Sequence, residues 1–196
     1  MKETEARPEP LPPGTAAPPF RMLSADAAVL PPGTRFPPEE WMSLDEQRGS
    51  PVVLVFYPAD FTPVCGEELA IFNEVLPELE RHGAKVFGIS VDSAWCHRAF
   101  AQDRHLRFPL LADFHPKGEV SRRYRSYREQ DGLAERSLFV LDRDGKVFWS
   151  HVSPIDVNPG VDGVLDALER LDGEQPAASN GAPPRSHDAA QEEPRP

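Results

Sequence analysis

Two thiols are the side chains in this sequence with the most distinctive chemistry. Cys65 and Cys96 are the only cysteines among 196 residues. Two cysteines cannot form the disulfide framework of a secreted domain, whereas two thiols in a reducing compartment can carry redox chemistry. They also lack the short ligand spacing of zinc motifs, and the histidines are scattered singly. We therefore expect thiol chemistry that uses neither a metal nor a cofactor.

Cys65 falls at the predicted start of a helix. A thiol is an effective nucleophile only as the thiolate. The helix is predicted to begin at Pro63 or Val64, which places the sulfur beside unpaired backbone N–H groups and the positive end of the helix dipole. Thr62 offers a hydroxyl to the thiolate or to a substrate oxygen, and Pro58 fixes the loop and shields the site from water. Helical position alone is equally compatible with a cysteine buried as a small apolar residue.

The elements around Cys65 alternate between strands and helices. An unbroken apolar run at Pro51–Tyr57 is typical of a central strand covered on both faces. The helix that follows should be irregular at Pro77 and end at Gly83. Beyond it we expect strands at 85–91 and 109–112, helices at 94–105 and 117–124, a polar loop at 124–135, a hairpin of 137–141 with 146–149, and a closing helix at 161–171. This order predicts an α/β fold with a mixed central sheet flanked by helices.

Composition separates the two ends from the middle. We expect a disordered Pro-rich tail at residues 1–16, one domain at 17–172 and a disordered tail at 173–196. The net charge of −11 is spread along the chain, which argues against nucleic acid as a partner. No stretch approaches the roughly 20 apolar residues of a membrane span, and the N-terminus lacks a basic segment followed by an apolar run. These features predict a cytoplasmic protein that does not bind a membrane.

The residues around Cys65 resemble a known active-site motif. The segment Pro58-Ala-Asp-Phe-Thr-Pro-Val-Cys65 is similar to the Pro-x-x-x-Thr-x-x-Cys motif of peroxiredoxins, the family of alkyl hydroperoxide reductases and thiol-specific antioxidant proteins. Glu68 stands where many members carry a glutamate, and Arg136 resembles the active-site arginine of the family. The likeness runs from about residue 17 to residue 171 and includes the segments 90–93 and 151–159.

This resemblance implies a thioredoxin-like fold and the reduction of hydrogen peroxide or organic hydroperoxides, with Cys65 becoming a sulfenic acid. Arg136 would favour the thiolate and hold a peroxide oxygen. Thr62 would orient the reacting atoms in the loop that Pro58 fixes. Glu68 would position the arginine rather than exchange protons. Taken alone, Arg136 would be a surface arginine and Glu68 an ordinary glutamate in a first helical turn.

Oxidised Cys65 can return to the thiol by two routes. Cys96 lies near the start of the next predicted helix and could form an intramolecular disulfide with Cys65. Some peroxiredoxins keep a resolving cysteine in this helix, usually further along it, and a packed structural thiol is the alternative for Cys96. The other route uses an external thiol, namely thioredoxin, a glutaredoxin-like protein or a low-molecular-weight thiol. The resemblance also implies a homodimer.

Two rival functions use the same fold. A thiol–disulfide reductase needs a second cysteine close to the first, and Gly66, Glu67 and Glu68 supply none. A non-catalytic redox sensor or a chaperone-like binding module would keep Cys65 without turnover, and this alternative stays open at the level of the sequence.

Overall fold

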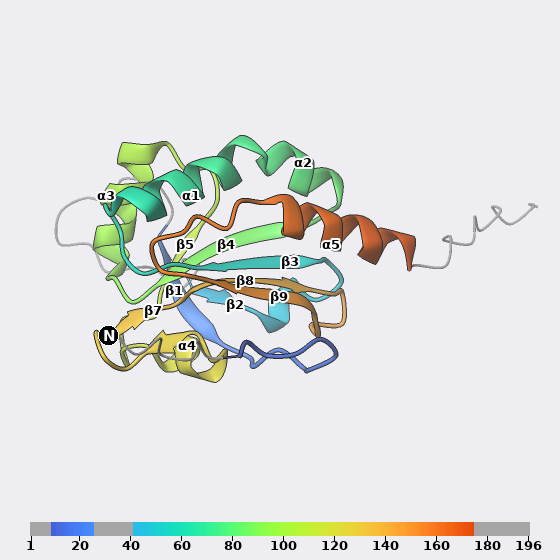
Figure 1. Cartoon of the computed structure of the whole chain (residues 1–196), viewed down its shortest axis with the longest axis horizontal. Coiled ribbons are helices and arrows are strands. Elements are labelled where there is room, and N and C mark those ends of the chain that lie inside the picture. The colour runs from blue at the N-terminus through green and yellow to red at the C-terminus, as the bar shows by residue number, and fades with distance from the viewer. Residues whose placement is uncertain (1–8, 26–40, 175–196) are drawn as a thin grey trace, which may run out of the picture.

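A seven-stranded sheet runs through the centre of the molecule (Figure 1). The computed structural model describes residues 9–25 and 41–174. Three central strands are parallel, and the pairings on either side of them are antiparallel, so the sheet is mixed. In spatial order the strands are β2 (Trp41–Ser43), β1 (Arg21–Ala25), β5 (Leu110–Ala112), β4 (Lys85–Ser90), β3 (Val52–Phe56), β8 (Arg136–Leu141) and β9 (Val147–Ser153).

Helices cover both faces of this sheet. Figure 1 shows α1 (Pro63–Glu74), α2 (Leu76–Arg81) and α5 (Asp162–Gly173) on one side of the sheet and α4 (Glu119–Arg123) on the other. The helix α3 (Ala94–Arg104) packs against β5 and β1. A short 3-10 helix at Asp45–Gln47 and a small hairpin of β6 (Tyr127–Arg128) with β7 (Leu133–Ala134) complete the described elements.

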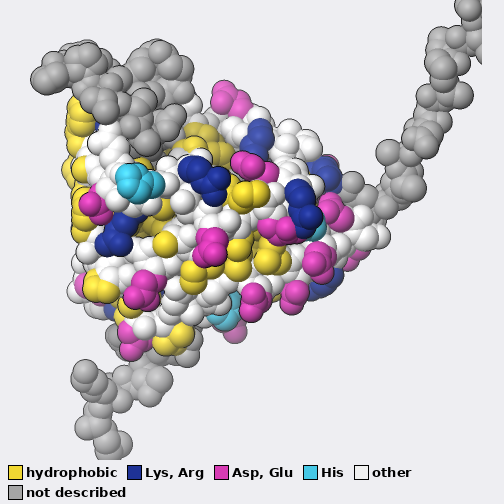
Figure 2. All heavy atoms as spheres, turned by 90° about the horizontal axis from the view of Figure 1, so that it is seen from above, with side chains coloured by type: hydrophobic (Ala, Val, Ile, Leu, Met, Phe, Trp, Pro, Cys, Tyr) yellow, Lys and Arg dark blue, Asp and Glu magenta, His cyan; other side chains and the backbone are white. Residues whose placement is uncertain are grey.

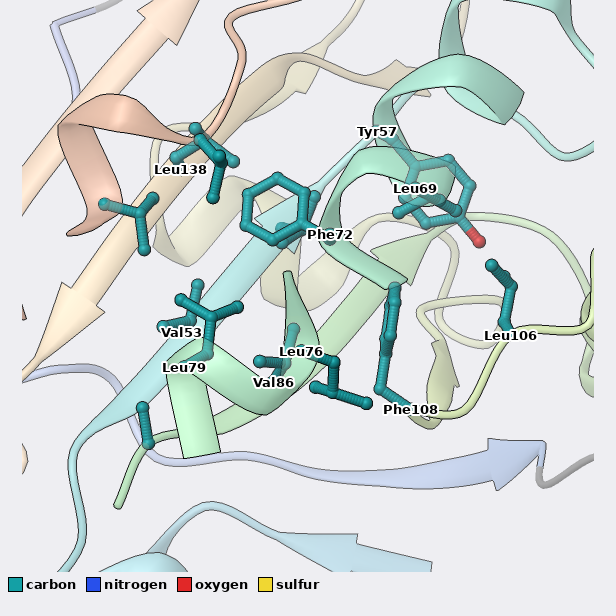
Figure 3. Close-up of a cluster of buried hydrophobic side chains, with 14 of the residues drawn as sticks. Val53, Tyr57, Leu69, Phe72, Leu76, Leu79, Val86, Leu106, Phe108 and Leu138 are labelled. Atoms are coloured by element: carbon teal, nitrogen blue, oxygen red, sulfur yellow. The ribbon is translucent and has the colours of Figure 1, made fainter. Parts of the chain in front are cut away.

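The strand β3 is buried along its whole length because it lies in the middle of the sheet. Its side chains alternate between the two faces, as extended backbone requires. Val53 and Val55 join the cluster under α1, α2 and α5, part of which Figure 3 shows, whereas Leu54 and Phe56 join the cluster on the opposite face. A strand apolar on both faces needs helices on both sides, so the predicted α/β fold with its mixed sheet is confirmed.

The chain after Cys65 follows the predicted pattern of one interrupted helix. Helix α1 ends at Glu74, and α2 begins at Leu76 with Pro77 in its first turn. Proline has no N–H to donate to the preceding turn, so the break falls just before it. Gly83 then adopts a φ of +69°, the left-handed conformation that glycine adopts without strain.

Three elements differ from the expectations. Strands β1 and β2 were not predicted from the sequence, and β2, at the edge of the sheet, is too short to show an alternating pattern. Its three residues include only one buried side chain, that of Met42. The expected polar loop at 124–135 contains the hairpin of β6 and β7, whose two-residue strands are also too short to predict. The reversal between them has Gly132 at a φ of +70°.

The folded chain starts before residue 17, where the sequence predicted a domain boundary. Gly14 N donates to Val147 O at 2.8 Å, and Val147 N donates to Thr15 O at 2.9 Å. Leu11 is buried in the cluster on the α4 face. Composition missed this packing because a proline-rich segment can still pair with a sheet edge through its non-proline residues. The remaining parts of the two predicted tails, 1–8 and 175–196, lie outside the described residues.

The surface carries charges of both signs. Figure 2 shows Asp and Glu side chains spread over one face and interspersed with Lys and Arg. Such mixing gives no single-sign patch on that face for a polyanion to follow. Within the described ranges, no helix has both the length and the hydrophobicity to cross a lipid bilayer.

Candidate active site

The loop between β3 and α1 places Cys65 in the first turn of α1. Thr62 is the N-cap residue and has extended backbone, with Pro63 directly after it. Gly66 N donates to Thr62 O at 2.9 Å, which closes the first turn around the cysteine. Because the N–H groups of a first helical turn have no partners within the helix, this position favours negative charge on the sulfur.

The side chain of Arg136, at the start of β8, reaches the sulfur of Cys65. Its Nη2 lies 3.4 Å from Cys65 Sγ. Its Nη1 is paired with Glu68 Oε2, and its Nε and Nη2 donate to Ile155 O at 3.1 and 2.8 Å. The structure thus brings Cys65, Glu68 and Arg136 together with all three side chains buried. A planar guanidinium with several fixed partners can point one N–H at the sulfur with little freedom to turn away.

Glu68 is a buried carboxyl group with a single cationic partner. Burial raises its pKa from 4.5 to about 7, and the neighbouring charge of Arg136 opposes that rise. Its Oε1 has no hydrogen-bond partner among the described residues. The contact between Glu68 and Arg136 is consistent with a carboxyl group that holds the arginine in place.

Thr62 and Pro58 lie in the loop between β3 and α1. Pro58 is buried and Thr62 is half-buried. The Thr62 hydroxyl donates to Ala59 O at 3.0 Å, which leaves its oxygen lone pairs as acceptors. A hydroxyl fixed in this way can accept a hydrogen bond from a hydroperoxide at the helix start. Cys65 itself has no exposed surface and packs with the hydrophobic cluster under α1.

Cys96 is half-buried in the first turn of α3. Burial and a hydrogen bond from the thiol to Asp60 raise the pKa of Cys96 to about 12, and the charge of Asp92 adds to the rise. The helix start would favour a thiolate, but two carboxylates beside the sulfur oppose it. In this conformation Cys96 is therefore a poor nucleophile.

Two contacts in and beside the site were not predicted from the sequence. The carbonyl of Ile155 holds Arg136, and no side-chain pattern reveals a backbone acceptor. Asp60 was part of the quoted motif, but its side chain was given no role, and it contacts His97. His97 was predicted only as one of several singly scattered histidines. Among the described residues, no three His, Cys, Asp or Glu side chains gather as metal ligands would.

Comparisons with known proteins identify the family of this chain. Residues 13–150 match the model of the AhpC/TSA family. The chain belongs to this family, the peroxiredoxins. One relative of this peroxiredoxin is a thioredoxin peroxidase from Echinococcus granulosus, which is 35% identical over 134 residues, or 65% of this chain and 68% of that protein. Another is the alkyl hydroperoxide reductase E of Mycobacterium bovis, which is 40% identical over 101 residues, or 52% of this chain and 66% of that protein.

Solved structures support the same fold for this peroxiredoxin. Mycobacterium tuberculosis AhpC superposes with a TM-score of 0.72 at 29% identity, and the match covers 88% of this chain and 99% of AhpC. The thioredoxin-like fold inferred from the motif is therefore confirmed. The matched segments span about two thirds of the length of the two curated relatives.

Proposed function

We propose that this peroxiredoxin reduces hydrogen peroxide and organic hydroperoxides, with Cys65 as the attacking thiol. The observation that carries the proposal is the approach of Arg136 Nη2 to within 3.4 Å of Cys65 Sγ at a helix start. A fixed cation and unpaired N–H groups around one sulfur favour the thiolate. Cys65 also packs in the hydrophobic cluster under α1, but a cysteine used only for packing would have no guanidinium at its sulfur.

The residues of the site have distinct parts in this proposal. The Cys65 thiolate attacks the terminal oxygen of the peroxide, a bond forms between sulfur and oxygen, and the O–O bond breaks. The departing oxygen takes the electron pair of that bond and then a proton, so the products are a sulfenic acid and water or an alcohol. Arg136 stabilises charge that develops on the peroxide oxygens, and Thr62 orients the substrate. Glu68 and Pro58 hold Arg136 and the loop in place.

Regeneration by an external thiol fits this structure better than resolution by Cys96. The sulfenic acid condenses with a thiol to a mixed disulfide and releases water, and a second thiol then restores Cys65. The raised pKa of Cys96 leaves little thiolate for an attack on Cys65. We propose thioredoxin, a glutaredoxin-like protein or a low-molecular-weight thiol as the donor. Intact mass after one equivalent of peroxide distinguishes the routes, because an internal disulfide and a sulfenic acid differ in mass.

A homodimer belongs to the same proposal. Several large apolar side chains are exposed in the single chain, and an interface between two copies would remove those it covers from water. They are Trp41, Phe61, Trp95, Phe114 and Val157. Sedimentation equilibrium of the full chain tests the dimer, and a monomer at every concentration would contradict it.

The decisive experiment is peroxide consumption measured with a thiol donor. Cys65→Ser should abolish turnover, whereas Cys96→Ser should keep the rapid reaction of Cys65 with peroxide. Cys96→Ser serves as the matched control because it removes the other thiol of the chain. Peroxidase activity retained in Cys65→Ser would contradict the proposal. Oxidation of Cys65 without turnover, with every donor supplied, would favour the non-catalytic sensor instead.

A further inference from the structure

A group of buried polar side chains lies beside the active-site loop and has no part in the chemistry proposed above. Its members are Tyr57 at the end of β3, Asp60 in the loop and His97 on α3. Tyr57 and His97 have no exposed surface, and Asp60 is 7% exposed. Figure 3 shows Tyr57 among the side chains of the hydrophobic cluster under α1, with its hydroxyl oxygen at the end of the ring. Buried polar groups of this kind persist only when they bond to one another.

The hydrogen bonds of His97 determine which of its nitrogens carry hydrogen. Its Nε2 lies 3.2 Å from Leu111 O, and a carbonyl oxygen only accepts, so Nε2 carries a hydrogen. Its Nδ1 lies 2.9 Å from Asp60 Oδ2. The Tyr57 hydroxyl also lies 3.3 Å from Nδ1, but it is closer to Asp60 Oδ1, to which it donates at 2.8 Å. Its single hydrogen is therefore used at the carboxylate, and the contact between Nδ1 and Asp60 needs a hydrogen of its own.

The carboxylate of Asp60 receives donors from several elements. Besides Tyr57 and His97, the Cys96 thiol bonds to it. An ionised carboxylate accepts at both oxygens, so this arrangement suits a charged Asp60. A charged Asp60 requires a hydrogen on His97 Nδ1 as well, which makes the ring an imidazolium. Asp92 is the other carboxylate facing this group, and it bonds to the backbone of Asp60 rather than to the ring.

This charge pair is attached to the turn that begins α1. Asp60 N donates to Asp92 Oδ2 at 2.9 Å, so both the backbone and the side chain of Asp60 are held. The next residue, Phe61, has a φ of +57°, a conformation that strains a bulky side chain. Its ring packs on Phe100 of α3 with the centroids 5.0 Å apart. Strained backbone persists only where its surroundings fix it, and here α3 contacts both Phe61 and the preceding Asp60.

We propose that Asp60 and His97 form a buried ion pair that sets the position of Thr62 and Cys65, and that both are positioning residues for peroxide reduction. The proposal rests on the proposed function for its kinetic test only. Helix α3 and strand β5 thereby fix the loop through one imidazolium, which bridges the Asp60 carboxylate and the Leu111 carbonyl. Neither residue needs to touch the substrate.

Two substitutions separate the two contacts of His97. The amide of His97→Asn reaches about as far as Nδ1 and keeps a donor for Asp60, whereas the amide of His97→Gln reaches about as far as Nε2 and keeps a donor for Leu111. Both are made in the Cys96→Ser background, so that Cys65 is the only thiol. Ala99→Ser, on the exposed side of α3, is the control for substitution in this helix.

Three measurements are made on each variant: the rate of Cys65 oxidation by hydrogen peroxide, the rate of its alkylation by iodoacetamide, and the thermal unfolding midpoint. We expect His97→Gln to slow oxidation about tenfold or more, with a smaller change in alkylation, because misplaced orienting groups affect the peroxide transition state most. His97→Asn should restore part of the rate. A purely structural role would lower both midpoints and leave the folded variants equally reactive with peroxide, and that result would overturn the proposal.

A measurement on the wild-type protein covers the case in which the variants do not fold. In ¹⁵N-labelled protein, both ring nitrogens of His97 should show bound hydrogens at neutral pH. A neutral ring with one protonated nitrogen would overturn the ion pair. The wild-type oxidation rate tests the proposed function separately, because an inert Cys65 would contradict the enzyme while the nitrogen signals would still report on the pair.

Discussion

Arg136 and Cys65 are 71 positions apart in the chain, and their side chains meet with Nη2 3.4 Å from Sγ. The contact depends on two elements, since α1 presents the sulfur in its first turn and β8 begins with the arginine. Both side chains are almost completely buried, so the attraction between them is weakly screened by water.

Replacement of Arg136 should remove most of the peroxidase activity. We expect Arg136→Met to slow oxidation of Cys65 by about 100-fold or more, because a fixed donor to developing charge contributes on this scale. Arg136→Lys keeps the charge but cannot bond Ile155, Glu68 and Cys65 at once. Its rate of Cys65 oxidation should therefore fall between those of the wild-type protein and Arg136→Met. Stopped-flow kinetics with hydrogen peroxide measures the effect. A folded Arg136→Met with the wild-type rate would contradict this assignment.

The hydroxyl of Thr62 should matter more than its methyl group. Thr62→Ser keeps the donor that bonds Ala59 O, so its rate with peroxide should stay within a few fold of wild type. Thr62→Val keeps the shape, loses the hydroxyl, and should be slower by about 10- to 100-fold. The same stopped-flow assay compares the pair. Equal rates for the serine and valine variants would show that the hydroxyl takes no part.

Glu68 should give the stability of the protein a particular dependence on pH. Burial raises its pKa from 4.5 to about 7, so the folded protein holds a proton that the unfolded chain releases. The contribution of this proton to the free energy of unfolding is fully present below about pH 4.5 and is lost as the pH rises through about 7. Because glutamine does not titrate, we expect the free energy of unfolding of Glu68→Gln to lack this decrease. In the wild-type protein the decrease amounts to at most about 3 kcal/mol.

Urea unfolding at about pH 4.5, 6 and 8 measures this dependence in both proteins. Other groups titrate in the same way in each, so the difference between the two curves isolates Glu68. Parallel curves would mean that Glu68 has no raised pKa in the folded state.

Cys96 should react slowly with alkylating agents. Because burial and the carboxylate of Asp60 raise its pKa to about 12, little thiolate is present near neutral pH. In the Cys65→Ser variant, iodoacetamide at about pH 8 should modify Cys96 more slowly than it modifies free cysteine. Mass spectrometry over time gives the rate. Alkylation as fast as that of free cysteine would return Cys96 to consideration as a resolving thiol.

The sequence allowed the central part of the fold to be predicted, because long buried segments carry strong periodic signals. The strand at β3, the helix that begins at Pro63 and the break near Pro77 all follow from local rules of burial and proline chemistry. Strands β1 and β2 were missed because strands of only a few residues carry no distinct pattern. The packing of Leu11 was missed because it depends on a sheet edge formed by distant residues.

Prediction of the site had a different limit. Cys65, Thr62 and Pro58 could be chosen because they are close in the chain, and Arg136 and Glu68 because they resemble family positions. Contacts that depend on the backbone, such as Ile155 O with Arg136, are set only when the chain folds. The partnership of Asp60 and His97 likewise crosses from a loop to a helix, which local spacing cannot reveal. The roles of all these residues remain predictions for the experiments above.

The N-terminal segment along β9 has a consequence for how this chain meets other chains. Strand β9 ends the sheet, and its outer backbone groups would be free to bond another strand. Hydrogen bonds from residues 14–17 occupy that border near Lys146 and Val147. This part of the border is therefore closed to intermolecular strand addition. A chain shortened by its first 17 residues would uncover unsatisfied amides there and acquire a tendency to aggregate.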